Sequence, residues 1–158
     1  MPKIDKLIQA HRSSLSPEEL LVIDCGDHMD RAFIETEGSN GEANIAVMNA
    51  TGYDAAILGN NEGLTFDQDT LQHLYGTLAK FPVVGSNMYL EGGDIPAWLK
   101  SRLIIQKGQL KIGLIGVTID FTDFYELLGW DVRDPLECVA RLVHELRSEV
   151  HVLIVISH

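Results

Sequence analysis

The sequence predicts an α/β fold in which a largely parallel sheet is flanked by helices. Five short apolar runs alternate with segments of helical periodicity, and each run is followed at once by small or polar residues. Such runs are typical of parallel strands that are buried on both faces. The carboxyl ends of these strands lie at one edge of the sheet, where ligands bind in open α/β folds. The runs cover residues 20–23, 55–58, 81–84, 112–115 and 152–156.

The first half of the chain predicts three helices. Residues 3–12 show the apolar spacing of a helix, and so do residues 67–80, which carry four apolar side chains on one face. A further helix is expected over 41–50, and Gly52 should end it because glycine readily takes the left-handed conformation of a helix end. The stretch 34–44 carries three glutamates and is most simply a solvated loop.

The second half predicts a hairpin and one well-marked helix. Residues 86–102 contain two glycines and a proline and are expected to form a loop. Residues 103–115 contain two strand-like runs around Lys-Gly, which predicts a hairpin. Asp134 followed by Pro135 is a strong helix start. We expect one sheet to contain the strands that end at Asp24, Leu58, Val84 and Ile156, with the hairpin at or beyond its edge.

Composition excludes several classes of protein. The 158 residues are 46% hydrophobic, which fits a packed domain, and no apolar run approaches the ~18 residues that span a bilayer. The net charge is −11 and no basic stripe is present, which disfavours nucleic acid as a partner. The first residues lack the apolar core of a signal peptide, and two distant cysteines do not suggest a disulfide framework. These features predict a cytoplasmic protein without membrane contact.

Polar residues follow three of the predicted strands. Asp27 comes after the first, Asn60 and Asn61 after the second, and His158 after the last. Carboxylate, amide and imidazole groups at one sheet edge could hold a divalent cation. Each feature alone also has a structural explanation: an Asx turn at Asp27, a Gly-Asn turn at Asn60, and a hydrogen-bonded surface histidine. His28, in the first loop, is interpreted as a structural residue.

The combination of motifs resembles the calcineurin-like metallophosphoesterases. The stretch 48–60 and the strand 111–117 are most similar to the 5′-nucleotidase branch of that superfamily. The resemblance covers nearly the whole chain. It implies a metallophosphoesterase domain of the αββα sandwich type. The three motifs that carry it are Gly26-Asp27, Gly59-Asn60-x-Glu62 and Ser157-His158.

The resemblance also implies a two-metal centre that hydrolyses phosphate esters of small molecules. Asp27 would bridge the metals, and Asn60 and His158 would both ligate one of them. The metals would be Mn, Zn, Mg or Co. A bridging hydroxide would attack phosphorus, while the metal ions stabilise the developing charge.

Two positions depart from the family pattern. The residue after the ligand Asn is normally a catalytic His, and here it is Asn61. An amide can donate a hydrogen bond to a phosphoryl oxygen but cannot deliver a proton at neutral pH. The Asp that orients this His falls at Leu64. The pair has therefore been lost together.

The resemblance further implies a single, partial domain over residues 1–158. The family's opening strand with Asp-x-His, and its second half with Gly-His-x-His, have no counterpart in this sequence. We therefore expect the isolated chain to be inactive and to hold no metal or one weakly bound ion. Without the opening strand, an unpaired sheet edge offers a route to a homodimer.

Two functions agree with these residues. The chain is part of a metal-dependent phosphoesterase that acts on nucleotides or related phosphate esters, or it is part of a catalytically weakened nucleotide-binding or regulatory module on the same fold. The intact Gly-Asp, Gly-Asn and Ser-His motifs favour the first function, and Asn61 with Leu64 favours the second. A receiver-like doubly wound domain would leave Gly-Asn-x-Glu unexplained.

Overall fold

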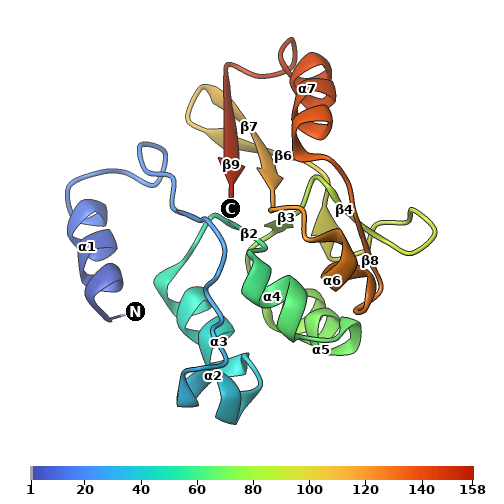
Figure 1. The fold of residues 1–158 in the computed structure, drawn as a ribbon. Helices are drawn as coiled ribbons and strands as arrows, with labels where there is room; N and C mark the ends of the chain where they lie inside the picture. The colour runs from blue at the N-terminus through green and yellow to red at the C-terminus, as the bar shows by residue number, and fades with distance from the viewer. Residues whose placement is uncertain (1) are drawn as a thin grey trace.

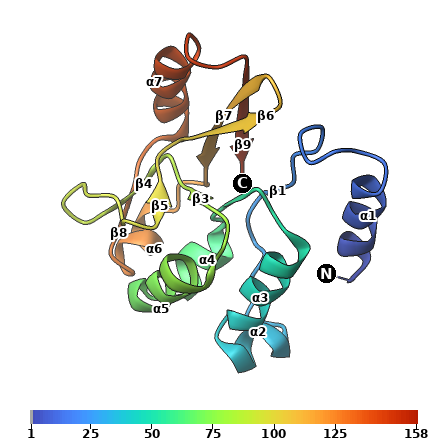
Figure 2. The same ribbon diagram turned by 180° about the vertical axis from the view of Figure 1, so that it is seen from behind.

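The computed structural model describes residues 2–158, in which two larger β-sheets and one two-stranded sheet are flanked by helices (Figures 1 and 2). In the first sheet all neighbouring strands are parallel, in the order β1-β2-β3-β5. Its strands are β1 (Ile23–Asp24), β2 (Ala55–Ile57), β3 (Val83–Val84) and β5 (Leu99–Lys100).

The second sheet contains the hairpin of β6 (Leu103–Lys107) and β7 (Leu110–Val117), and β9 (Val152–Ser157) pairs parallel to β7. The prediction that the strand ending at Ile156 shares a sheet with the other three is therefore wrong. The hairpin is also not an edge of the first sheet. Glycine explains the stacking, because a Cβ on Gly116 of β7 would lie 2.5 Å from Ile57 of β2. β7 thus packs against the face of β2.

The two sheets and their helices form four layers, in agreement with the predicted αββα arrangement. Ile57 and Val84 of the first sheet pack against Ile156 of the second. On the outer face of the second sheet, Ile115 and neighbouring apolar residues pack against Leu142 of α7 (Pro135–Leu146). The largest core cluster lies on the other side, between the first sheet and the helices that follow β1 and β2.

Those helices are short. They are α2 (Ile34–Ser39), α3 (Glu42–Thr51), α4 (Asn60–Thr65), α5 (Gln68–His73) and the π-helix η1 (Leu74–Leu78). α1 (Pro2–Arg12) precedes β1, and its Arg12 guanidinium donates hydrogen bonds to the carbonyls of Thr51 and Gly52. None of the helices in residues 2–158 is long and apolar enough to cross a membrane.

Several helix boundaries agree with the sequence signals. α3 ends before Gly52, which has φ +78°. The Asp67 side chain accepts the Thr70 N–H at the start of α5, and Asp134 accepts the Glu137 N–H at the start of α7.

The predicted loops were wrong in part. Residues 34–44 contain α2 and the start of α3, and residues 86–102 contain β5 and β4 (Met88–Leu90). β4 pairs antiparallel with β8 (Trp130–Val132), which follows the short helix α6 (Thr122–Glu126).

Candidate metal centre

Three residues from distant parts of the chain meet where strands of both sheets end. Asp27 lies in the loop after β1, Asn60 is the first residue of α4, and His158 follows β9. The His158 Nε2 atom lies 3.3 Å from Asp27 Oδ2 and 3.2 Å from Asn60 Oδ1. The structure therefore brings together the three residues that the sequence proposes as ligands, although β9 belongs to the second sheet.

The imidazole of His158 is held in one orientation. Its Nδ1 atom lies 2.9 Å from the carbonyl oxygen of Cys25, and a carbonyl oxygen can only accept. Nδ1 therefore carries the proton in the neutral ring, and the lone pair of Nε2 faces the oxygens of Asp27 and Asn60. Three lone pairs that face one another repel unless a cation lies among them. A proton on Nε2 or a metal ion would supply that charge.

The backbone of Asp27 is in an unusual conformation. Asp27 has φ +57°, in the left-handed region that a residue with a side chain rarely adopts, and Gly26 before it has φ +91°. The two loops also approach each other closely. A Cβ on Gly26 would lie 2.6 Å from the Gly59 nitrogen, and a Cβ on Gly59 would overlap the Asp27 carboxylate. Glycine at both positions allows Asp27 to sit against the start of α4.

Glu62 connects the loop after β1 with the start of α4. Its carboxylate is fully buried and accepts the backbone N–H groups of Asp27 (2.9 Å), Met29 (2.7 Å) and Gly59 (2.8 Å). The neighbouring Asn61 N–H donates to Asp27 Oδ1 at 2.8 Å. In the sequence, Glu62 stands out only as the last residue of the Gly59-Asn60-x-Glu62 motif, without a role of its own. The available signal was a glutamate three residues after the residue that caps α4, the spacing of a capping box.

His28 extends this buried network away from the candidate metal centre. Its Nδ1 atom lies 2.8 Å from Asp24 Oδ1, and its Nε2 atom lies 2.7 Å from the Tyr75 hydroxyl. Burial alone lowers the pKa of His28, but Glu62, Asp24 and Asp27 raise it by more, so its pKa lies above the usual value. The structure thus agrees with the interpretation of His28 as a hydrogen-bonded structural residue.

Asn61 and Leu64 lie one helical turn apart on α4. Leu64 is half-buried and packs against the largest core cluster, so no carboxylate stands beside Asn61 at that position. Among the described residues, the Asn61 Oδ1 atom has only a long contact of 3.5 Å, with Asn60 Nδ2. The Asn61 side chain is therefore an amide that can donate a hydrogen bond, with no proton to transfer.

The donors present fit a single divalent cation. In the part of the chain that the structure describes, no group of three or more His, Cys, Asp or Glu residues is arranged to hold a metal. Asp27, Asn60 and His158 together offer one carboxylate, one amide oxygen and one imidazole nitrogen. Mixed oxygen and nitrogen donors of this kind suit Mn²⁺ or Zn²⁺, with water completing the shell.

Comparisons with known proteins point to one superfamily. No protein-family model matches the chain. The uncharacterized metallophosphoesterase YunD of Bacillus subtilis is 36% identical over 160 residues, which cover 99% of this chain and 34% of YunD. UshA of Escherichia coli is 29% identical over 119 residues, which cover 73% of this chain and 21% of UshA. The chain thus spans about a third or less of these relatives.

Solved structures with low sequence identity share the fold. The NAD nucleotidase NadN of Haemophilus influenzae superposes with a TM-score of 0.82 at 20% identity, over 98% of this chain and 31% of NadN. The calcineurin-like phosphoesterase YfkN of Bacillus subtilis superposes with a TM-score of 0.73 at 23% identity, over 98% of this chain and 52% of that structure. The fold of nearly the whole chain therefore recurs within these longer chains.

Proposed function

Because the chain belongs to the calcineurin-like metallophosphoesterases, on their 5′-nucleotidase-like branch, we propose that it forms part of a metal centre that hydrolyses nucleotides or related phosphate esters. The convergence of Asp27, Asn60 and His158 carries this proposal. A His158 nitrogen that is oriented by the Cys25 carbonyl and lies 3.3 Å from an Asp27 oxygen and 3.2 Å from an Asn60 oxygen supplies the donors that a cation site requires.

Each residue has a distinct part in the proposed centre. His158 gives a neutral nitrogen ligand, Asn60 an amide oxygen, and Asp27 the negative charge. Oδ1 of Asp27 is fixed by the Asn61 N–H at 2.8 Å, so Oδ2 is the oxygen that faces His158. When bound, divalent ions polarise the phosphoryl group and activate water for attack on phosphorus.

Further ligands complete the proposed centre. A bridged pair of metal ions needs more ligands than one carboxylate, one amide and one imidazole. Some ligands must bridge both ions, and others must bind each ion separately. We therefore propose that residues 1–158 alone hold at most one ion weakly and turn over no substrate. Activity belongs to a polypeptide in which the remaining ligands are present.

The proposal is tested in a chimera where residues 1–158 replace the matching segment of YunD. Hydrolysis of 4-nitrophenyl phosphate and nucleoside monophosphates is measured with Mn²⁺, Mg²⁺, Zn²⁺ and Co²⁺, beside unmodified YunD. We expect metal-dependent turnover that falls at least about 100-fold with Asp27→Ala and is unchanged with His144→Ala, an exposed histidine on α7. Equal activity of the Asp27→Ala and unmodified chimeras would refute the proposal.

A second function is favoured by Asn61 and Leu64. An active centre without a proton donor at position 61 suits a protein that binds nucleotides for regulation and hydrolyses them slowly. In the chimera, Asn61→His alone should restore little monoester hydrolysis, since Leu64 cannot orient the new imidazole. Asn61→His with Leu64→Asp should raise the rate by about tenfold or more, because an oriented general acid is then available.

A matched control separates the gain in hydrolysis rate from the loss of stability that any polar group at the half-buried position 64 would cause. Asn61→His with Leu64→Asn introduces a polar side chain of the same size but no carboxylate. It should resemble Asn61→His alone in kcat. Equal rates for the Asp- and Asn-containing pairs would show that no general acid had been missing.

A further inference from the structure

Two helices far from each other carry pairs of large apolar side chains that are exposed. On α1, Ile4 is 52% exposed and Leu7 is 61% exposed, and on α6, Phe124 is 64% exposed and Leu127 is 81% exposed. A single exposed apolar residue is ordinary on a protein surface. Here the residues of each pair are three positions apart, so they lie on one face of their helix. Each helix therefore presents an apolar face.

Charged side chains of opposite sign flank the two faces. Lys3 and Lys6 each precede an apolar residue of α1, and Asp123 and Glu126 each precede one of α6. All four side chains are exposed, and in the part of the chain that the structure describes none has a hydrogen-bond or ion-pair partner. The basic face of α1 consists of Lys3, Ile4, Lys6 and Leu7, and the acidic face of α6 consists of Asp123, Phe124, Glu126 and Leu127. The two faces thus share one apolar pattern with reversed charges.

Both faces are held in place from behind. Tyr125, the middle residue of the acidic face, is fully buried, and a Cβ on Gly63 of α4 would lie 2.5 Å from its ring. Asp5, the middle residue of the basic face, accepts a hydrogen bond from Gln9 Nε2 at 3.2 Å. The C-terminal end of α1 is fixed through Arg12. Because the helices are already ordered, little conformational entropy is lost when a partner binds to either face.

The two faces cannot meet within one chain. α1 and α6 lie on opposite sides of the molecule in both views (Figures 1 and 2). Two copies that joined through their basic faces would oppose lysines, and two that joined through their acidic faces would oppose carboxylates, which is unfavourable in both cases. The basic face of one copy against the acidic face of another pairs opposite charges and buries apolar groups together. Charge complementarity therefore favours contact between unlike faces of two copies.

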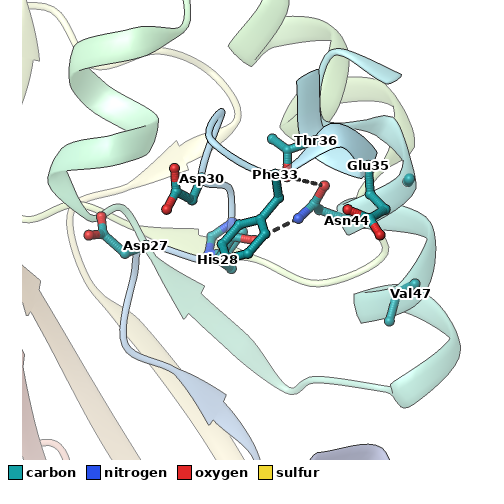
Figure 3. Close-up of a pocket in the computed structure, with 9 residues that line it drawn as sticks. Asp27, His28, Asp30, Phe33, Glu35, Thr36, Asn44 and Val47 are labelled. Atoms are coloured by element: carbon teal, nitrogen blue, oxygen red, sulfur yellow. Dashed lines mark hydrogen bonds between the residues drawn. The ribbon is translucent and has the colours of Figure 1, made fainter. Parts of the chain in front are cut away.

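A cleft at Phe33 is the other surface that combines acidic and apolar groups near the candidate metal centre. Its volume is about 470 Å³, and Figure 3 shows Asp30 on one side of Phe33 and Glu35 on the other. Its walls come from the loop after β1 and from α2 and α3. Its charges therefore do not repeat every three residues along one helix, as those of the basic face do. The cleft matches α1 less well than the acidic face does.

We propose that the protein associates head to tail, with the basic face of α1 of one copy packed against the acidic face of α6 of the next. A contact between two different faces leaves one free face of each kind at the ends, so it produces open chains or closed rings. The contact is small and its rim remains wet, so association is weak and becomes measurable at about 0.1–1 mM chain. It does not involve Asp27, Asn60 or His158, and it is independent of the proposed function.

Sedimentation equilibrium of the 158-residue chain tests the proposal. The weight-average mass should exceed 17.5 kDa and rise with concentration. Lys3→Glu with Lys6→Glu should weaken association at least about tenfold, because carboxylates then oppose carboxylates. Lys100→Glu with Lys111→Glu is the matched control, since it changes the net charge equally at exposed lysines outside α1. It should associate like the unmodified chain.

Reversal of the charges on both faces separates the contact from a loss of folding. Asp123→Lys with Glu126→Lys should also weaken association at least about tenfold. When these two substitutions are combined with Lys3→Glu and Lys6→Glu, the charges are again complementary and association should return. A misfolded α6 could not be rescued by changes on α1, so recovery identifies the two faces as partners.

Three results would overturn the proposal. One is a mass that stays at 17.5 kDa at 1 mM chain, about the highest concentration at which so small a contact should act. Another is equal association in all variants, which would indicate a different contact, such as a free sheet edge. The third is loss of association in Phe33→Ser with Glu35→Lys, which would place α1 in the cleft at Phe33 instead.

Discussion

Glu62→Ala is expected to lower the free energy of unfolding by about 4 kcal/mol, since it removes a buried carboxylate that accepts three backbone N–H groups. The N–H groups of Asp27, Met29 and Gly59 would lose their acceptor in an interior that water does not reach. Against a total stability of ~5–15 kcal/mol, this is a large fraction. Urea denaturation followed by circular dichroism measures it.

Two further variants make this prediction specific. Glu126→Ala removes an exposed glutamate and should change stability by less than about 0.5 kcal/mol. Glu62→Gln keeps the shape but leaves one acceptor oxygen and places an NH₂ group against N–H donors, so it should recover only part of the loss. A loss below about 1 kcal/mol for Glu62→Ala would show that the carboxylate does not hold the loops together.

Gly59→Ala is expected to weaken metal binding about tenfold or more and to destabilise the protein by about 2 kcal/mol. Gly59 has φ −89° and ψ −178°, which alanine adopts freely, so the backbone is not the obstacle. The obstacle is space, because the new methyl group would overlap the Asp27 carboxylate and crowd its backbone nitrogen. Asp27 must then move away from Asn60 and His158.

Gly38→Ala is the matched control. Gly38 lies in α2, where a Cβ would have no neighbour within 4 Å, so alanine should be neutral or slightly stabilising there. Isothermal titration with Mn²⁺ and thermal unfolding compare both variants. Unchanged Mn²⁺ affinity in Gly59→Ala would show that the close approach of the loops does not set the position of Asp27.

The sequence predicted the candidate site better than the sheets. Asp27 and Asn60 could be placed together because they follow parallel strands, whose carboxyl ends share an edge. His158 was placed with them for the same reason, yet its strand lies in the second sheet. An apolar sequence on both faces of a strand indicates that the strand is buried, but it does not indicate which strands lie next to it. The two sheets stack closely because Gly116 has no side chain where β7 meets Ile57. The sequence alone does not show that these two residues are neighbours.

Short elements were missed for a related reason. β4 and β5 have three and two residues, too few to show a period of two, and they lie among two glycines and a proline that indicate a loop. α4 was not predicted, and a Gly-Asn turn was only the structural alternative at Asn60, although Glu62 at the third helical position marks a helix start. The cleft at Phe33 has no sequence signal, since it depends on how α2 and α3 pack beside Asp27.

The central claim is that Asp27, Asn60 and His158 form one cation site, and Mn²⁺ titration of the 158-residue chain tests it most directly. Calorimetry or electron paramagnetic resonance should detect one weakly bound ion per chain. His158→Ala and Asp27→Asn should each weaken its binding at least about tenfold, while His144→Ala leaves it unchanged. Mn²⁺ binding that is equal in His158→Ala and His144→Ala, or two tightly bound ions per chain, would contradict the account.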